Sequence, residues 1–108
     1  MRTADIILNQ LGGGRFAAMT GSKNFIADGN TLRMSLARNA SKANRLYITL
    51  DADDTYTMRF FRYTAPRFNS KTVSFTEEKV TEVREIKGVY CDMLQGLFTE
   101  VTGLYTRF

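Results

Sequence analysis

Three runs of alternating side chains in the middle of the chain constrain its fold most strongly. Residues 31–36, 45–50 and 56–63 place apolar side chains at every second position. Because successive side chains of a β-strand point to opposite faces, each run predicts a strand with one apolar face. The apolar set consists of Leu32, Met34, Leu36, Leu46, Ile48, Leu50, Tyr56, Met58 and Phe60. We expect these side chains to form the core side of a sheet.

The alternate positions of the same runs carry arginines and aromatic rings. They are Arg33, Arg45, Tyr47, Arg59, Phe61 and Tyr63. Proteins that bind single-stranded nucleic acid combine cations that follow the backbone with rings on which bases stack. On this hypothesis the three arginines contact phosphates and the three rings stack on bases. A packing explanation stays open, in which Phe61 and Tyr63 contact the N-terminal helix and form a second small core.

The N-terminal part predicts a short helix followed by short strands. Ile6, Ile7 and Leu11 recur at helical spacing within residues 4–11, and the glycines at 12–14 end this helix. Short strands are expected at 15–19 and 24–27, followed by a turn at 28–30.

The C-terminal part predicts one more strand and a long helix. Residues 71–75 alternate again after Pro66 and indicate a sixth, edge strand. Apolar side chains at spacings of three and four then predict a helix of about five turns over 83–101, ended by Gly103. Leu94 and Leu97 on this helix are expected to cover the apolar face of the sheet.

These elements predict a single α+β domain over residues 1–108. Its expected architecture is a mainly antiparallel β-meander of about five to six strands. A short N-terminal helix precedes the sheet, and a long C-terminal helix packs on one of its faces. A length of 108 residues and a hydrophobic content of 44% fit one core of ordinary size.

The composition argues against an enzyme. The chain has no histidine, so the usual general base and the commonest metal ligand are missing. We therefore predict no catalytic residue, no bound metal and no cofactor. The net charge is +4, and residues 15–71 hold ten basic residues against four acidic ones. This uneven charge indicates a negatively charged partner, such as nucleic acid, on one side of the molecule.

Four short motifs are better explained by structure than by chemistry. The order Gly21-Ser22-Lys23 does not match a phosphate-binding loop, which requires Gly-Lys-Ser or Gly-Lys-Thr at a helix start. The acidic run at 51–54 lacks the glycine and glutamate of a calcium loop and predicts a hairpin turn. The glutamates at 77, 78, 82 and 85 are expected around the start of the long helix, where they favour its dipole. Cys91 on that helix is expected to be a buried thiol.

The sequence also bears on where the protein resides. No apolar run approaches the about 18 residues of a membrane span, and the first residues do not fit a signal peptide. A single cysteine excludes an internal disulfide. We therefore predict a cytoplasmic protein without a membrane partner.

Three segments resemble a known group of proteins. They are LGGGRFAAMTGSKNF at 11–25, ARNA at 37–40 and FTEVTGLYT at 98–106. In these segments the chain resembles small uncharacterised proteins encoded by bacteriophages and other bacterial mobile elements, which have no established activity. The resemblance implies a protein that is made in the cytoplasm of a bacterial host and handles nucleic acid or binds a host protein.

Two functions remain open at this point. The first is non-enzymatic binding of nucleic acid, expected to be single-stranded, through the six basic and aromatic positions. The second is a small inhibitor or modulator of a host factor, such as a defence protein, in which exposed tyrosine and arginine act as interface anchors. The choice between DNA and RNA and the number of copies in an assembly, including a homo-oligomer, are open as well.

Overall fold

Five strands form one antiparallel sheet in the computed structural model, which describes residues 3–106. The strands are β1 (Lys23–Asp28), β2 (Thr31–Ser35), β3 (Arg45–Leu50), β4 (Tyr56–Thr64) and β7 (Lys79–Val89). Their order in the sheet is β1-β2-β3-β4-β7. The predicted α+β fold with an antiparallel meander is confirmed.

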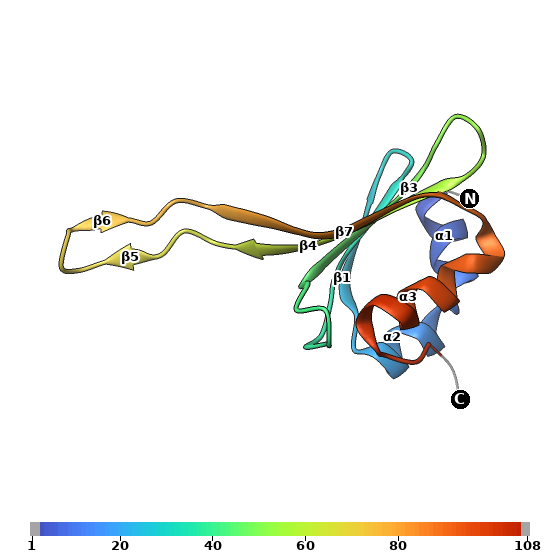
Figure 1. Ribbon diagram of the computed structural model, residues 1–108, viewed down its shortest axis with the longest axis horizontal. Helices are drawn as coiled ribbons and strands as arrows, with labels where there is room; N and C mark the ends of the chain where they lie inside the picture. Colours follow the sequence, from blue (N-terminus) through green and yellow to red (C-terminus); the bar gives the residue numbers. More distant parts are fainter. Residues whose placement is uncertain (1–2, 107–108) are drawn as a thin grey trace.

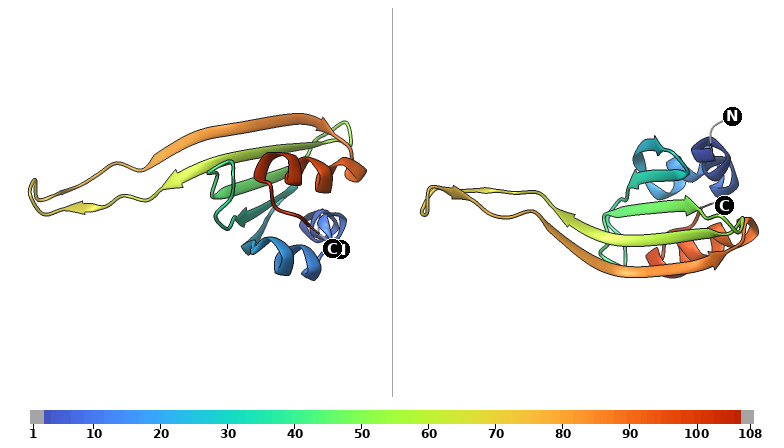
Figure 2. Two further views of the ribbon diagram at one scale, coloured as in Figure 1. Left: turned by 60° about the horizontal axis from the view of Figure 1, so that its bottom comes forward. Right: turned by 90° about the horizontal axis from the view of Figure 1, so that it is seen from above.

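The helices lie on one face of this sheet (Figures 1 and 2). They are α1 (Thr3–Leu11), α2 (Gly14–Thr20), the 3-10 helix η1 (Cys91–Met93) and α3 (Leu94–Thr102). Helix α1 buries Ile7 and Leu11, and α3 buries Leu94 and Phe98. Both pairs are four residues apart, which is the spacing that places two side chains on one side of a helix.

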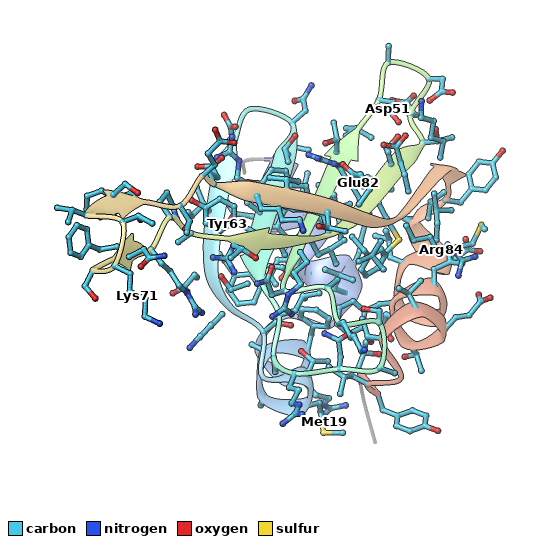
Figure 3. All side chains as sticks on the ribbon, turned by 60° about the vertical axis from the view of Figure 1, so that its left-hand side comes forward. Met19, Asp51, Tyr63, Lys71, Glu82 and Arg84 are labelled. Carbon is cyan, nitrogen blue, oxygen red and sulfur yellow. The ribbon has the colours of Figure 1, made fainter. Side chains whose placement is uncertain are left out.

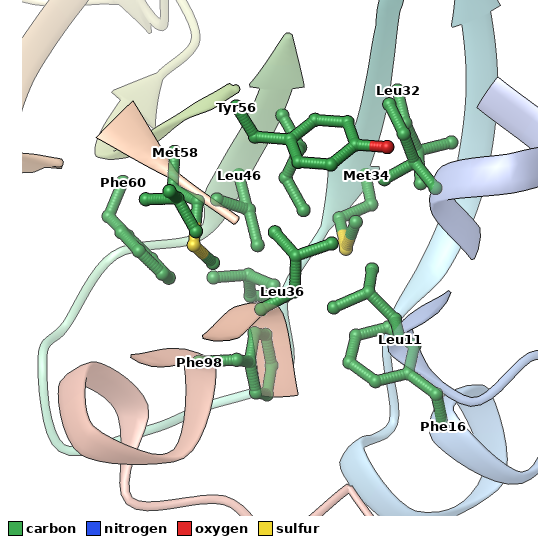
Figure 4. Close-up of a cluster of buried hydrophobic side chains, with 14 of the residues drawn as sticks. Leu11, Phe16, Leu32, Met34, Leu36, Leu46, Tyr56, Met58, Phe60 and Phe98 are labelled. Carbon is green, nitrogen blue, oxygen red and sulfur yellow. The ribbon is translucent and has the colours of Figure 1, made fainter. Parts of the chain in front are cut away.

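The core lies between the helices and the inner face of the sheet (Figure 4). Its fully buried strand residues are Met34, Leu46, Ile48, Met58, Phe60 and Val89. From the helices, the rings of Phe16 and Phe98 meet edge to face with their centroids 4.9 Å apart. The predicted inward parity of the central strands is therefore confirmed. Because full burial of such a side chain contributes about 1.5–3 kcal/mol, this face fixes the register of the sheet.

The strand predicted at 15–19 is wrong, since this segment is helix α2. The Ala17 amide donates to the Gly13 carbonyl at 3.2 Å, and the Thr20 hydroxyl donates to the Phe16 carbonyl at 2.7 Å. Alanine and methionine also favour helix. In so short an apolar run, periodicity alone does not distinguish a strand from a short helix. The helical conformation buries the ring of Phe16 in the core, which favours helix over strand here.

The helix predicted over 83–101 is also wrong in its first half. Residues 79–89 form strand β7, which pairs with β4, and the C-terminal helix α3 is only nine residues long. The end of that helix at Gly103 is confirmed, with a left-handed φ of 75° and its amide donating to the Thr99 carbonyl. The C-terminal helix does cover the sheet, because Leu94 is fully buried and Leu97 is partly buried against the core.

Two β-bulges explain why β7 has the apolar spacing of a helix. Tyr56 and Met58 on β4 are two residues apart, but their partners Val89 and Ile86 on β7 are three apart. A second bulge follows near Val83, where the register shifts between Phe60 and Phe61. Gly88 supplies a left-handed φ of 68° at the first bulge, as glycine does in bulges of this kind.

Beyond the sheet, the β4–β7 hairpin continues as a long arm (residues 65–78) that projects from the body of the protein (Figures 1 and 2). The molecule measures 50 × 32 × 23 Å along its principal axes. A two-stranded sheet of β5 (Phe68–Asn69) and β6 (Ser74–Phe75) forms the tip. The strand predicted at 71–75 is therefore wrong in extent and place, since only its last two residues pair and they do not join the main sheet.

The first prediction tests the packing of α3. Leu94→Ala should lower the free energy of unfolding by about 2–5 kcal/mol, because it leaves a cavity in a filled core. Met93→Ala, at the neighbouring and exposed position, is the control and should cost less than about 1 kcal/mol. Urea or guanidinium unfolding measures both. Equal losses for the two variants would show that α3 does not cover the sheet.

The second prediction concerns the arm. All residues from 65 to 78 are exposed, so replacing them with Asn-Gly should leave the body of the protein folded. Asn-Gly suits a two-residue hairpin turn, here between Thr64 and Lys79, which pair in the sheet. We expect the free energy of unfolding to change by less than about 1 kcal/mol. A loss of several kcal/mol in denaturant unfolding would mean that the arm supports the core.

Candidate nucleic-acid interface

The six predicted residues lie together on the outer face of the sheet. Strand register places Arg33 opposite Tyr47, and Tyr47 opposite Arg59, in one row across β2, β3 and β4. In a second row, Arg45 on β3 lies opposite Phe61 on β4. Directly opposed residues of an antiparallel pair project to the same face, so these side chains form one surface. The N-terminal helix does not cover them, because α1 packs on the other face.

Each arginine of this surface lies over an aromatic ring. The guanidinium of Arg59 is 4.5 Å from the centroid of Phe61, and that of Arg33 is 5.0 Å from Tyr47. Arg45 lies 5.5 Å from the ring of Tyr63. These distances are within the about 6 Å of a cation–π interaction. The cations and rings are therefore held in place before any partner binds.

Phe61 differs from the other two rings in exposure. Only 4% of its surface is exposed, and it meets the Tyr47 ring edge to face at 4.9 Å. A base cannot stack on Phe61 unless the side chains around it move, so the expectation that this ring is open is wrong. Tyr47 and Tyr63 are partly exposed, each with an arginine over its ring.

Acidic residues neutralise two of the three arginines. Arg33 forms an ion pair with Asp28, and the Nε of Arg59 donates to the Glu82 carboxylate at 2.6 Å. The bond to Glu82 raises the pKa of Arg59 further above its usual value. Exposed ion pairs of this kind contribute only about 0–1 kcal/mol, so a phosphate can replace the carboxylate.

Two of the acidic partners, Glu78 and Glu82, were missed because their positions depend on the register of β7. Glu78 and Glu82 were expected near a helix start, but they lie on the arm and on β7, beside β4. The Tyr63 hydroxyl donates to Glu78 at 3.1 Å, which raises the pKa of Tyr63 above its ordinary 10.0. Figure 3 labels Tyr63 on β4 and Glu82 on the neighbouring strand β7. The β-branched residues between 80 and 89 were the sequence signal that could have found this strand.

Arg45 has no carboxylate partner within residues 3–106, and its position is fixed in another way. Its Nη1 donates to the Asn44 carbonyl at 3.0 Å. The Asn44 side-chain amide donates to the Tyr63 carbonyl at 2.8 Å and accepts the Tyr63 amide at 2.7 Å. These bonds join the start of β3 to β4 and hold Arg45 and Tyr63 side by side. Arg45 is therefore the arginine of this surface best placed to meet an anion.

A groove of about 490 Å³ runs beside these residues along β1 and β2. We call it the Tyr47 groove, and its lining consists of Asn24, Phe25, Ile26, Arg33, Met34, Ser35, Arg45 and Tyr47. The register of β1 against β2 shifts between Lys23 and Ile26, where Asn24 has a left-handed φ of 57°. The groove lies at this irregularity, and a ring and two guanidinium groups are among its lining.

Among the described residues, no group of three or more acidic or cysteine side chains is placed to hold a metal ion. Asp53 at the β3–β4 turn instead accepts hydrogen bonds from the amide and hydroxyl of Thr55, which confirms the predicted hairpin turn and lowers the pKa of Asp53. Cys91 is exposed at the start of η1, so the expectation that its thiol is buried is wrong. None of the helices within residues 3–106 has the length and apolar character needed to span a bilayer.

No protein-family model, no curated protein and no solved structure matches this chain. The origin in a bacteriophage or mobile element therefore stays a prediction, and the function rests on the arrangement of the residues.

The third prediction separates the rings of this surface. Phe61→Ala should lower the free energy of unfolding by about 3–5 kcal/mol, because a buried ring is lost between Tyr47 and Arg59. Tyr47→Ala removes a partly exposed ring and should cost clearly less. Denaturant unfolding of both variants measures the difference. A Phe61→Ala protein as stable as the wild type would show that this ring is free to leave the surface.

Proposed function

We propose that this protein is a non-enzymatic binding protein for single-stranded nucleic acid. The observation that carries the proposal is the Tyr47 groove, which is lined by the partly exposed ring of Tyr47 and by the side chains of Arg33 and Arg45. Bases stack on such rings regardless of sequence, and arginines beside them meet the phosphates.

The charge distribution supports Arg45 over the other arginines as the phosphate contact. Arg33 and Arg59 have carboxylate partners that a phosphate must displace, whereas Arg45 contacts a backbone carbonyl and a ring. Arg45 and Tyr63 lie next to each other, so a phosphate at Arg45 would bring the adjoining base over Tyr63. The proposal thus keeps Tyr47, Tyr63, Arg33 and Arg45 in direct contact with the strand and gives Phe61 a supporting role.

The fourth prediction tests this contact with a fluorescein-labelled twelve-nucleotide oligo(dT). Fluorescence anisotropy between 25 and 200 mM salt should show that Tyr47→Ala weakens binding by about 1–3 kcal/mol, with an unchanged salt dependence. Arg45→Gln should make the negative slope of log K against log salt shallower by about 0.7, because one phosphate contact is lost. The same series with oligo(rU) compares RNA with DNA.

Matched controls make the result specific. Tyr105→Ala removes a ring that is exposed near the C-terminal end, and Arg67→Gln removes a cation from the arm. Neither should change the affinity as much as its counterpart at the groove. The proposal fails when the wild-type protein does not bind at 25 mM salt, or when the groove variants and their controls behave alike.

A second candidate function is binding of a host protein through the tip of the arm. Phe68 and Phe75 pack edge to face at 5.3 Å but remain 57% and 70% exposed, and Val73 is 77% exposed. A two-stranded ribbon without a covering layer is only marginally stable in water. Aromatic side chains displayed in this way are typical anchors of protein interfaces.

The variant with Asn-Gly in place of the arm distinguishes the two functions. It keeps oligonucleotide binding if the groove is the site, whereas a protein-binding function requires the tip. If a single bacterial protein is retained by the wild type and lost with Phe68→Ser/Phe75→Ser, while oligonucleotides do not bind, the second function replaces the first.

A further inference from the structure

A second basic surface lies at the end of the sheet, next to Arg45. The loop between β2 and β3 lies against the end of β4, and an open hollow of about 740 Å³ is lined by this loop and by Arg62 of β4. Arg38, Lys42 and Arg62 line this hollow, and no acidic residue is among its lining residues. Within residues 3–106, none of these three cations forms an ion pair. We call this site the cationic hollow.

The loop that carries two of these cations is rigidly built. The Asn39 side chain donates to the carbonyls of Ala37 and Ala43, both at 2.8 Å, and accepts the amide and hydroxyl of Ser41. All four hydrogen-bonding positions of the Asn39 amide group are therefore used within the loop. The Ala40 amide donates to the carbonyl of Thr102, which ties the loop to α3.

Lys42 lies in a sparsely populated backbone conformation. Lys42 has a left-handed φ of 66°, a conformation in which glycine or asparagine is far more common than lysine. Its side chain is exposed, so no burial explains a lysine here. Arg62 clamps the same point, since its Nη1 donates to the Lys42 carbonyl at 3.0 Å. The bond from Arg62 therefore fixes the backbone that carries Lys42 beside the hollow.

We propose that the cationic hollow binds a phosphate group. Three cations line one hollow without a carboxylate among its lining residues, so an oxyanion bound there is attracted by all three. Arginine offers bidentate hydrogen bonds to phosphate oxygens, and lysine offers a point charge. The N–H groups of Arg62 other than Nη1, together with the side chains of Arg38 and Lys42, can supply such donors.

The hollow also adjoins the groove, which indicates the source of the phosphate. Asn44 lines the hollow, while its carbonyl accepts Arg45 Nη1 and its side chain binds Tyr63. A strand that lies over Tyr47 and Tyr63 would therefore reach the hollow with its next phosphates. This part of the inference rests on the proposed function. A free phosphate compound has the same chemistry and is the other source to be tested.

The test uses the whole protein and two probes, pyrophosphate and the oligo(dT) of the binding assay. Pyrophosphate at constant ionic strength should shift the ¹H–¹⁵N amide signals of residues 37–44 in a saturable manner. Arg38→Gln/Lys42→Gly should abolish these shifts, and glycine at 42 keeps the fold because it accepts a left-handed φ. Arg67→Gln/Lys71→Gln on the arm removes the same charge and should leave the shifts intact.

The oligonucleotide arm decides the source. If the strand runs into the hollow, Arg38→Gln/Lys42→Gly should make the negative slope of log K against log salt shallower by about 1.4, which corresponds to two phosphate contacts. An unchanged slope with saturable pyrophosphate shifts would support a site for a free phosphate compound and refute the continuous path. The inference is overturned when pyrophosphate shifts the loop no more than sodium chloride of equal ionic strength does. This titration gives its answer even if the wild type binds no oligonucleotide, which would refute only the proposed function.

Discussion

The structure depends above all on burial of one face of β2, β3 and β4 beneath α1, α2 and α3. Shifting one of these strands by one residue would turn its own inward side chains, such as Leu46 and Ile48 on β3, to solvent and bring its outward side chains into the core. Burial thus fixes the register, and the register fixes which side chains meet on the other face. The strand register that the core fixes also places Arg33 opposite Tyr47 and Arg45 opposite Phe61.

The two-residue period made this part of the fold predictable. β2 and β3 pair without a bulge, so the alternation in the sequence is the alternation in the structure. The secondary-structure prediction failed where bulges interrupt that two-residue period or where an apolar run is too short to define it. On β7 the bulges near Val83 and Gly88 imitate helical spacing, and in α2 a single buried ring decides a short ambiguous run. Both errors came from reading periodicity without the partner strand or the core that the segment meets.

The same limit applies to the candidate site. Sequence alternation placed six residues on one surface, but it did not reveal that Phe61 is covered or that Asp28 and Glu82 pair with arginines. Those facts depend on neighbours that are distant along the chain, such as Arg59 and Glu82, which lie 23 residues apart. The cationic hollow was missed for a related reason. Arg62 meets the loop only because β4 runs back past Lys42, and Asn39 shapes that loop through its own side chain.

Charge is therefore arranged differently on the two ends of the outer surface. Near β7, the positive charges of arginines and the negative charges of glutamates offset one another. That region therefore suits a partner that is uncharged or that carries charges of both signs. Near the β2–β3 loop, Arg38, Lys42, Arg45 and Arg62 gather without a carboxylate partner among residues 3–106. A polyanion that approached the molecule would be drawn to this end first, because unpaired charges dominate the local field. Asn44 joins this end to Tyr63, so an anion held by the loop would lie directly beside the accessible rings. The positions of the cations, more than their number in the sequence, thus favour a strand that enters at the loop and continues along the groove.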